Sequence, residues 1–408
     1  MDVFDVKDTH GGYILCGRYG TYDAHEDLTG TPYGAFMLLT DKNGNVKKFM
    51  IYPLIYVLYS VVDFGKGSIT KKHGFFAVGR TRDEIAQGGF KAVMLRTKYD
   101  LNPICEENVA GASATPDITE STFRWVVRRG SNNFAMVGHT NSGGENCMKD
   151  SDVLFAVADK KCNIKMVNNN LMLRQFKMKN ADGNMSNEYG LSIADMGNNF
   201  IITGHVEGID ANCNAMDDDI LLMKLNKKGL VAKAFRVDVD NGSDIGTSIL
   251  YRTKKRSILV AGETVTSFLT AEQDPTLKMK KDIFLLEVDK KMKKAKKLEV
   301  FGDTWEENRE VDVVLSQDNN AVILGNTRSF WPLVQPPLTP QIQQTHLIER
   351  YNKVNQRCYD AEVKVKLVRI QFKHLEPIHE KKETAYEERE LEAYDVKLNQ
   401  TIICKKET

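Results

Sequence analysis

A short apolar segment that ends in glycine recurs six times along the chain, and no other feature constrains the fold as strongly. A polar residue follows the glycine in every copy, and threonine often comes next. Successive glycines are 58 to 66 residues apart: Gly17, Gly79, Gly138, Gly204, Gly262 and Gly325. Self-similarity at a nearly constant period indicates a repeat architecture, in which one supersecondary unit cannot bury its apolar surface alone.

A second recurring segment keeps the same period, and it is an apolar strand that runs into a lysine-rich turn. Asp or Asn followed by Lys and then Gly or Asn tolerates positive φ and suits a hairpin. The six turns begin near Asp41, Lys98, Asp159, Asn226, Asp289 and Asn352. A third strand-like segment precedes each glycine strand and a weaker fourth follows each turn. Every repeat therefore predicts four short antiparallel strands.

The repeats predict an all-β fold, because four antiparallel strands with two apolar faces need partners on both sides. Six such units stacked around an axis would bury both faces, so we expect a six-bladed β-propeller over residues 1–365. A seven-bladed propeller is the alternative blade count, and a linear β-solenoid is disfavoured because its repeats are usually about 20 residues long. Residues 366–408 predict a short β-rich C-terminal tail, a closing strand pair or a partial extra blade.

Charge and hydropathy argue against several classes of protein. Lys and Arg total 56 and Asp and Glu total 55, so nothing draws the whole chain to nucleic acid or to an anionic membrane. No apolar stretch approaches the roughly 20 residues of a spanning helix, and we expect no transmembrane segment. The first six residues lack the basic and apolar regions of a signal peptide. They also look like part of a strand, which is compatible with a targeting segment upstream.

The seven cysteines follow no recognisable framework. None belongs to a Cys-x-x-Cys pair, which argues against a zinc site or a thioredoxin-like motif. Cys147 and Cys213 each lie nine residues after their repeat glycine, so they occupy equivalent loops of successive repeats. A disulfide between them is disfavoured, because equivalent positions in neighbouring blades usually exceed the ~5.5 Å Cα separation that the bond needs.

The glycine strand ends, an aspartate that opens the third strand in three copies and the Asp/Asn-Lys turns together resemble a known repeat. They are similar to the tandem propeller repeats of secreted and surface proteins of bacteria, especially Bacteroidota-like organisms. The three aspartates are Asp152, Asp219 and Asp282; the other copies have Tyr33-Gly34, Gly89-Phe90 and Thr345-His346 there. The resemblance implies a propeller in an extracellular or cell-surface location and leaves the function open. WD, kelch and sialidase Asp-box signatures are absent from the sequence.

The two faces of such a propeller would differ. Loops between the second and third strands are long and unlike one another, whereas the other turns within a repeat are mostly short. Long variable loops on a rigid scaffold are the usual place for binding. The long loops are rich in acidic residues and the short turns in Lys and Arg, notably Lys290 to Lys297. This division predicts a binding face and allows assembly through oppositely charged faces; alternatively, lysine merely suits solvated turns.

The polar residue after each repeat glycine is a candidate binding residue. These residues would occupy equivalent positions toward the long-loop face, where they could form a polar annulus: Arg18, Arg80, His139, His205, Glu263 and Asn326. The alternative is that they are strand ends that meet solvent or bond the next loop. A metal site on His139 and His205 is disfavoured, because no third ligand follows at a fixed spacing.

Acidic residues around the third strand of the fourth repeat are candidate calcium ligands. Asp210, Asp217, Asp218 and Asp219 could supply the oxygen atoms that Ca2+ prefers, although their spacing does not match an EF-hand. We favour the structural explanation, in which Asp219 and its equivalent Asp152 bond backbone N–H groups at the start of the strand. No other cofactor is predicted.

The loop from Ser329 to Pro340 contains four prolines beside Phe330 and Trp331. Proline holds such a loop extended at a low entropy cost, so the two aromatic side chains suit contact with a protein or a sugar. The alternative is that they pack over the edge of a blade. Motifs of nucleophilic catalysis, phosphate-binding loops and zinc proteases are absent from the sequence.

The sequence therefore predicts a non-catalytic binding or assembly module that takes a protein or glycan partner at its long-loop face. One alternative is a carbohydrate-active enzyme with acidic residues at the axial end of that face, since different blades could supply a carboxyl pair. Another is a structural subunit of a cell-surface assembly.

Overall fold

The structure is a computed structural model of an all-β chain. It describes residues 2–9, 11–20, 34–64, 74–82, 90–110, 120–141, 151–167, 170–178, 185–209, 215–239, 243–265, 282–301, 309–315, 321–327, 345–351, 365–369, 372–375, 378–382 and 387–388. All regular secondary structure in these ranges is β-strand. A helix long and apolar enough to cross a membrane is absent from them.

Six sheets follow one another along the chain. Sheet 1 contains β1 (Asp2–Thr9), β2 (Gly12–Tyr19), β3 (Gly34–Thr40) and β4 (Val46–Tyr52). Sheet 2 contains β5 (Ile55–Asp63), β6 (Gly74–Arg82), β7 (Phe90–Lys98) and β8 (Pro103–Ala110). Sheet 3 contains β9 (Ser121–Arg129), β10 (Asn133–Asn141), β11 (Ser151–Asp159) and β14 (Leu173–Met178), with the hairpin β12 (Met166–Val167) and β13 (Asn170–Leu171) beside it.

The second half continues in the same order. Sheet 4 contains β15 (Met185–Asp195), β16 (Asn199–Ile209), β17 (Ala215–Asn226) and β18 (Val231–Val239). Sheet 5 contains β19 (Asp244–Arg252), β20 (Ser257–Thr264), β21 (Asp282–Asp289) and β22 (Ala295–Phe301). Sheet 6 contains β23 (Arg309–Leu315), β24 (Ala321–Thr327) and β25 (Thr345–Tyr351) in the described part. The predicted all-β class and the repeated four-stranded antiparallel sheets are confirmed.

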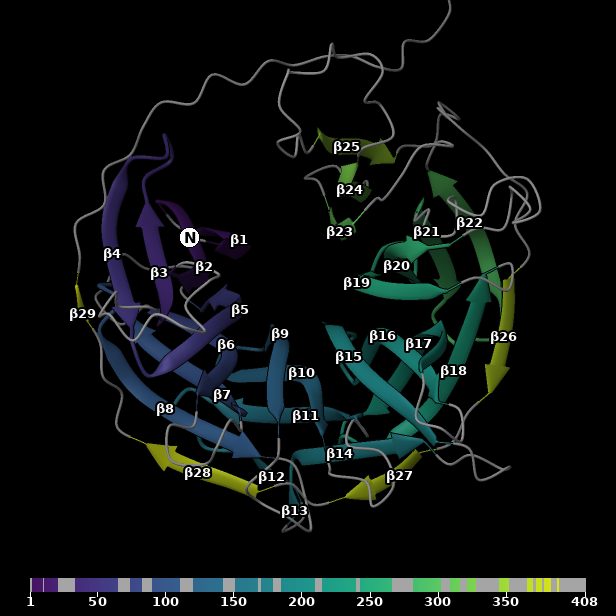
Figure 1. The fold of residues 1–408 in the computed structure, drawn as a ribbon, viewed down its shortest axis with the longest axis horizontal. Helices are drawn as coiled ribbons and strands as arrows, with labels where there is room; N and C mark the ends of the chain where they lie inside the picture. The colour runs from purple at the N-terminus through teal and green to yellow at the C-terminus, as the bar shows by residue number, and fades with distance from the viewer. Residues whose placement is uncertain are drawn as a thin grey trace, which may run out of the picture.

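The sheets lie one after another around a common centre, with the first strand of each sheet innermost and the later strands toward the rim (Figure 1). The inner strand of each sheet also packs on the sheet before it: β5 on β1 and β2, β9 on β5 and β6, β15 on β9 and β10, β19 on β15 and β16, and β23 on β19 and β20. The hydrophobic core is accordingly divided into clusters between consecutive sheets, as the repeat pattern requires.

The recurring glycine has a steric cause in this packing. The inner strand of each sheet carries a β-bulge next to the glycine of the second strand. A Cβ on Gly204 would lie 1.7 Å from the carbonyl oxygen of Tyr189 on the neighbouring strand. The same backbone contact, below 2.0 Å, recurs at four other repeat glycines: Gly17, Gly79, Gly138 and Gly262. Any larger residue would have to displace backbone, so the repeat retains glycine.

Buried polar side chains join neighbouring inner strands just after these bulges. Ser60 Oγ on β5 donates to Asp5 Oδ2 on β1 (2.9 Å) and accepts from the Val126 N–H on β9 (3.4 Å). Ser248 on β19 likewise accepts from the next inner strand, at the Val313 N–H of β23, but it donates to Asp312 on that same strand. We call this set the inner-strand relay. It satisfies buried backbone groups and links successive sheets near the centre.

The C-terminal tail contributes one strand to each of four sheets in reverse order. Its strands are β26 (Val365–Arg369), β27 (Phe372–Leu375), β28 (Ile378–Lys382) and β29 (Glu387–Glu388). They pair antiparallel with the outer strands β18, β14, β8 and β4 of sheets 4, 3, 2 and 1 respectively. Figure 1 shows these strands, coloured yellow-green, along the rim.

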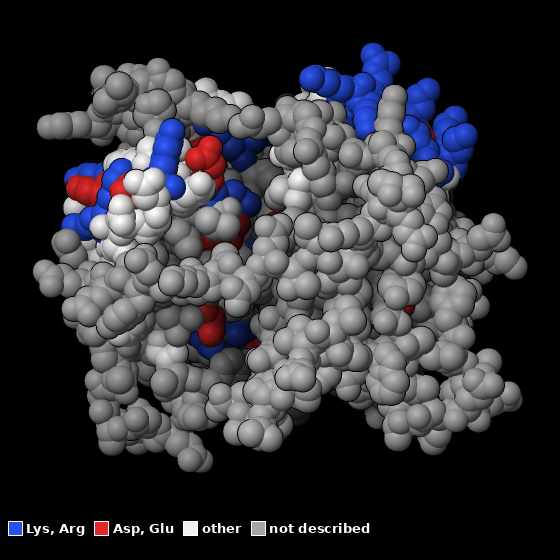
Figure 2. Space-filling model, turned by 90° about the horizontal axis from the view of Figure 1, so that it is seen from above, with Lys and Arg blue, Asp and Glu red and all other residues white. Residues whose placement is uncertain are grey.

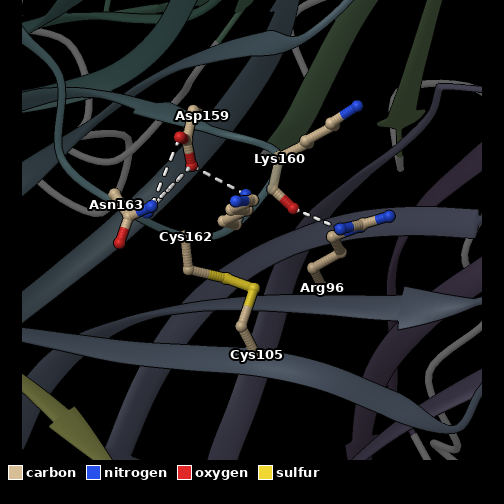
Figure 3. Close-up of a disulfide and its surroundings, with 7 residues drawn as sticks. Arg96, Cys105, Asp159, Lys160, Cys162 and Asn163 are labelled. Carbon is tan, nitrogen blue, oxygen red and sulfur yellow. Dashed lines mark hydrogen bonds between the residues drawn. A yellow bond between two sulfur atoms is a disulfide. The ribbon is translucent and has the colours of Figure 1, made fainter.

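A disulfide joins two neighbouring sheets. Cys105 on β8 is bonded to Cys162 in the turn after β11, with a Cα–Cα distance of 6.0 Å (Figure 3). The turn is shaped by Asp159, whose carboxylate accepts the N–H groups of Lys161 and Asn163. The bridge therefore connects the outer strand of sheet 2 with sheet 3. Cys147 and Cys213, considered above as a pair, lie outside the described residues.

Candidate functional site

The two predicted arginines of sheets 1 and 2 meet at an aromatic side chain from the inner strand β5. Arg18 Nη1 donates to the Tyr56 hydroxyl (3.0 Å), and Arg18 also pairs with Asp2 (2.8 Å). Arg80 lies on the other side, with its guanidinium carbon 5.0 Å from the centre of the Tyr56 ring and 4.2 Å from that of Phe90. Cations within about 6 Å of a ring face are attracted by its quadrupole.

A third arginine lies on the inner strand of sheet 3. Arg124 occupies the β-bulge of β9, and its guanidinium carbon is 4.2 Å from the centre of the Tyr59 ring on β5. Tyr59 packs in turn against Phe4 of β1, with ring centres 5.1 Å apart. Sequence reasoning did not select Arg124 or the tyrosines, because their meeting depends on how the sheets stack.

The two predicted histidines of sheets 3 and 4 likewise share an aromatic neighbour. Tyr189 of β15 stacks on His205 with ring centres 4.4 Å apart and meets the edge of His139 at 4.9 Å. His205 Nε2 lies 3.8 Å from Asp218 Oδ1 on β17. We call these residues together the cation–aromatic cluster: Arg18, Tyr56, Tyr59, Arg80, Phe90, Arg124, His139, Tyr189 and His205.

All members of the cluster are partly exposed. Positive charge is not balanced within its central part. Burial, followed by repulsion from Arg80, lowers the pKa of Arg124. Burial, then Arg124, His205 and Arg80, hold the pKa of His139 well below its usual value, so the imidazole is neutral at pH 7.

Polar atoms in this central part also lack hydrogen-bond partners among the described residues. Arg80 Nε, Arg124 Nε and His139 Nδ1 are buried atoms without a hydrogen bond to any described residue. Neither arginine forms an ion pair with a described carboxylate, in contrast to Arg18 with Asp2. Unpaired buried donors are rare in folded proteins and call for an explanation, of which a missing acceptor is one.

The remaining candidate binding residues lie elsewhere or beyond the described part. Glu263 of sheet 5 is buried, with 8% of its surface exposed. Asn326 of sheet 6 is described only as backbone, where it pairs with Arg309 and His346. Phe330 and Trp331 lie outside the described residues, as does the whole proline-rich loop. The cluster thus brings together four of the eight predicted binding residues.

The predicted calcium ligands separate along β17. Asp217 is exposed; Asp218 accepts from Ser243 Oγ (3.2 Å) and lies near His205. Asp219 forms an ion pair with Arg236 of the next strand, and Asp210 lies outside the described residues. Asp219 does gather with two other carboxylates, Asp238 and Asp244.

Burial raises the pKa of Asp244 to about 8, and repulsion from Asp219 and Asp238 adds to the rise. The equivalent aspartate of sheet 3, Asp152, accepts from Gln175 of β14 instead of meeting a cluster of acids.

Short turns of sheets 4 and 5 bring lysines together. Lys224 Nζ donates to the Lys290 carbonyl (3.3 Å), and Lys233 Nζ donates to the Lys291 carbonyl (2.7 Å). Burial, followed by repulsion from Lys233 and Lys290, lowers the pKa of Lys224. Figure 2 shows Lys and Arg side chains gathered at one end of the molecule.

Comparison with known proteins gives no family for the chain. The chain matches no protein-family model, and it matches no curated protein at a significant level.

Proposed function

We propose that the chain is a closed six-bladed propeller. Lys7 supports this closure: burial lowers its pKa, but attraction to Asp5 of sheet 1 and then to Asp312 of sheet 6 outweighs burial and leaves the pKa raised. Phe36, Phe49 and Ile51 form a buried apolar cluster on the opposite pleat of sheet 1 from the one that packs on sheet 2. Both features are expected if sheet 6 packs against sheet 1 and closes the ring.

We further propose that this propeller is a non-catalytic binding module, and that the cation–aromatic cluster holds an anionic group of its ligand. The observation that carries the proposal is the pair of arginines Arg80 and Arg124. Their positive charges repel each other, and neither forms an ion pair with a described carboxylate. The Nε donor of each also lacks a hydrogen-bond partner among the described residues. Guanidinium groups bind carboxylate, sulfate and phosphate through charge-assisted hydrogen bonds. The ring faces of Tyr56, Phe90 and Tyr59 would orient these groups and offer apolar contact.

The charge of the cluster supports binding over hydrolysis of a sugar bond. Glycoside hydrolysis usually needs two carboxyl groups on opposite sides of the bond. The members of the cluster on sheets 1 to 3 are arginines, aromatic residues and His139, and the carboxylate of Asp2 beside them is already paired with Arg18. An acidic glycan or an acidic peptide at a surface would suit this site, and the disulfide between Cys105 and Cys162 supports an extracytoplasmic location.

The test is a binding screen of the purified protein on acidic and matched neutral glycans and peptides, with product analysis for every hit. We expect saturable binding to acidic members only, weakened at least tenfold in Arg124→Gln and lost progressively in salt. Arg128→Gln is the matched control, because it removes the same charge from the same strand near the exposed turn, where Arg128 Nε donates to the Gly130 carbonyl.

Equal binding of neutral ligands, or equal affinity of Arg124→Gln and Arg128→Gln, would contradict the proposal. Turnover of a bound glycan would replace it with the enzyme alternative.

A further inference from the structure

Three carboxylates from three strands converge where sheet 4 meets sheet 5. Asp219 begins the buried part of β17, Asp238 lies near the end of β18, and Asp244 begins β19. One oxygen atom from each lies within 4.8 Å of the others. Asp244 is fully buried and Asp219 is 7% exposed. Like charges this close and this shielded from water repel strongly unless something neutralises them.

One carboxylate oxygen of Asp244 makes no normal hydrogen bond to a described residue. Arg236 pairs with Asp219, and the Val239 N–H donates to Asp244 Oδ2 (2.6 Å). Asp244 Oδ1 is buried and makes no hydrogen bond of normal geometry, and neither does the buried hydroxyl oxygen of Thr264. The Thr264 hydroxyl is nevertheless close enough to lower the pKa of Asp244. Two buried oxygens without normal partners therefore face the same acidic cluster.

We propose that Asp219, Asp238 and Asp244 bind a divalent cation, Ca2+, at the junction of sheets 4 and 5. The set differs from the calcium ligands predicted from the sequence, since it keeps only Asp219 of them. Oxygen atoms that coordinate one Ca2+ at 2.3–2.6 Å lie within about 5 Å of each other, which the observed spacing satisfies.

Calcium would also explain the orphaned oxygens. The Asp244 Oδ1 atom would become a ligand, and the Thr264 hydroxyl could complete the shell as a neutral oxygen donor. Bound Ca2+ would tie the start of β19 to β17 and β18, so it would stabilise the contact between two consecutive sheets. The proposal does not depend on the cation–aromatic cluster.

The test is a calorimetric titration of the EDTA-treated full chain with Ca2+ and, separately, with Mg2+. We expect one Ca2+ per chain with Kd on the order of 10⁻⁴ M, as for extracellular calcium modules, and weaker Mg2+ binding, since the site lacks an octahedral set. At a hundredfold excess of Ca2+ over Kd, the unfolding equilibrium constant should fall about 100-fold.

Asp244→Asn is the decisive variant, because it has nearly the same shape as a protonated aspartate and should fold. It should raise Kd at least tenfold and abolish the stabilisation by Ca2+. Asp217→Asn, an exposed neighbour on the same strand, removes one acidic charge and should leave both unchanged.

Absence of Ca2+ binding to the unmodified chain up to 10 mM, stronger binding of Mg2+ than Ca2+, or an unaltered Asp244→Asn would each overturn the proposal. Asp238→Asn provides the same readout if Asp244→Asn does not fold by circular dichroism.

Discussion

At the scale of single residues, burial and neighbouring charge decide what each ionisable side chain can do. Arg18 and Arg80 occupy equivalent repeat positions, yet only Arg18 pairs with a described carboxylate, Asp2. His139 and His205 are also equivalent, but His205 lies beside Asp218 whereas His139 lies near Arg124. The repeat therefore supplies the same backbone position several times, and the surroundings give each copy its own electrostatics.

His139 should make the folded state less stable in mild acid. Its pKa is well below the usual value in the folded state, because of burial and then Arg124, His205 and Arg80. The unfolded chain takes up a proton near pH 6.5 and the folded chain does not, so stability is full above this pH and falls below it. We expect a loss of about 1 kcal/mol between pH 6.5 and pH 5.5 from this residue.

Urea unfolding of the unmodified chain and of His139→Asn at both pH values measures this term. The pH dependence should be smaller in the variant by that amount. An identical pH dependence in the two proteins would show that His139 titrates normally in the folded state.

At the scale of strands, the inner-strand relay shows how neighbouring sheets are held near the centre. Asp5, Ser60 and Ser248 each follow a bulge, and each bonds the next inner strand in sequence. Trp125 occupies the corresponding place in sheet 3, where it has no oxygen to accept a hydrogen bond, and its ring instead lies 4.7 Å from the Lys7 ammonium. The sequence analysis missed the relay; a small polar residue before a β-branched residue, as in Ser60-Val61 and Ser248-Ile249, is the signal that could have located it.

Ser60→Ala should destabilise the protein by about 1–3 kcal/mol, because it leaves the buried Val126 N–H without its acceptor and removes one of the donors to Asp5. Ser248→Ala should have a smaller effect at the junction of sheets 5 and 6, because the Val313 N–H keeps its bond to Asp312 Oδ1 (2.8 Å). Ser131→Ala, at an exposed turn, should change stability by no more than about 0.5 kcal/mol. Denaturant unfolding checks all three, and equal stability of Ser60→Ala and Ser131→Ala would rule out an energetic role for the relay.

At the scale of the whole molecule, the tail changes how the outer edges are protected. Exposed edge strands present unpaired N–H and C=O groups that template association with other chains. Four outer strands are covered by β26 to β29, and the chain reaches them in the reverse of their sequence order. The tail thus links four sheets, each of which is formed by a separate repeat.

Removal of residues 365–408 should uncover β4, β8, β14 and β18 together. We expect the truncated chain to associate in light scattering at concentrations where the full chain does not. Its unfolding free energy should also fall, by about 0.5–1.5 kcal/mol for each backbone hydrogen bond lost. A truncated chain that stays monomeric and keeps full stability would show that the tail strands protect nothing.

The amino-acid sequence alone determined the repeat and its strands. The glycines from Gly17 to Gly262 recur because strand periodicity and a backbone contact with the adjacent strand act locally, so the pattern is visible without any tertiary information. The polar residues after the glycines were also visible, as equivalent positions. Their partners were not, because Tyr56 and Tyr189 each contact one such residue on their own sheet and one on the preceding sheet.

Only the tertiary structure decided which side chains share a site. The sequence grouped Asp219 with Asp217 and Asp218, its neighbours along the chain, whereas the fold groups it with Asp238 and Asp244 across strands. The fold likewise chose Cys105 and Cys162 as a disulfide pair and distributed the tail over four sheets. The physical reason is common to these cases: strand formation follows from local pattern, but contacts between sheets depend on stacking, twist and register, which no short stretch of sequence encodes.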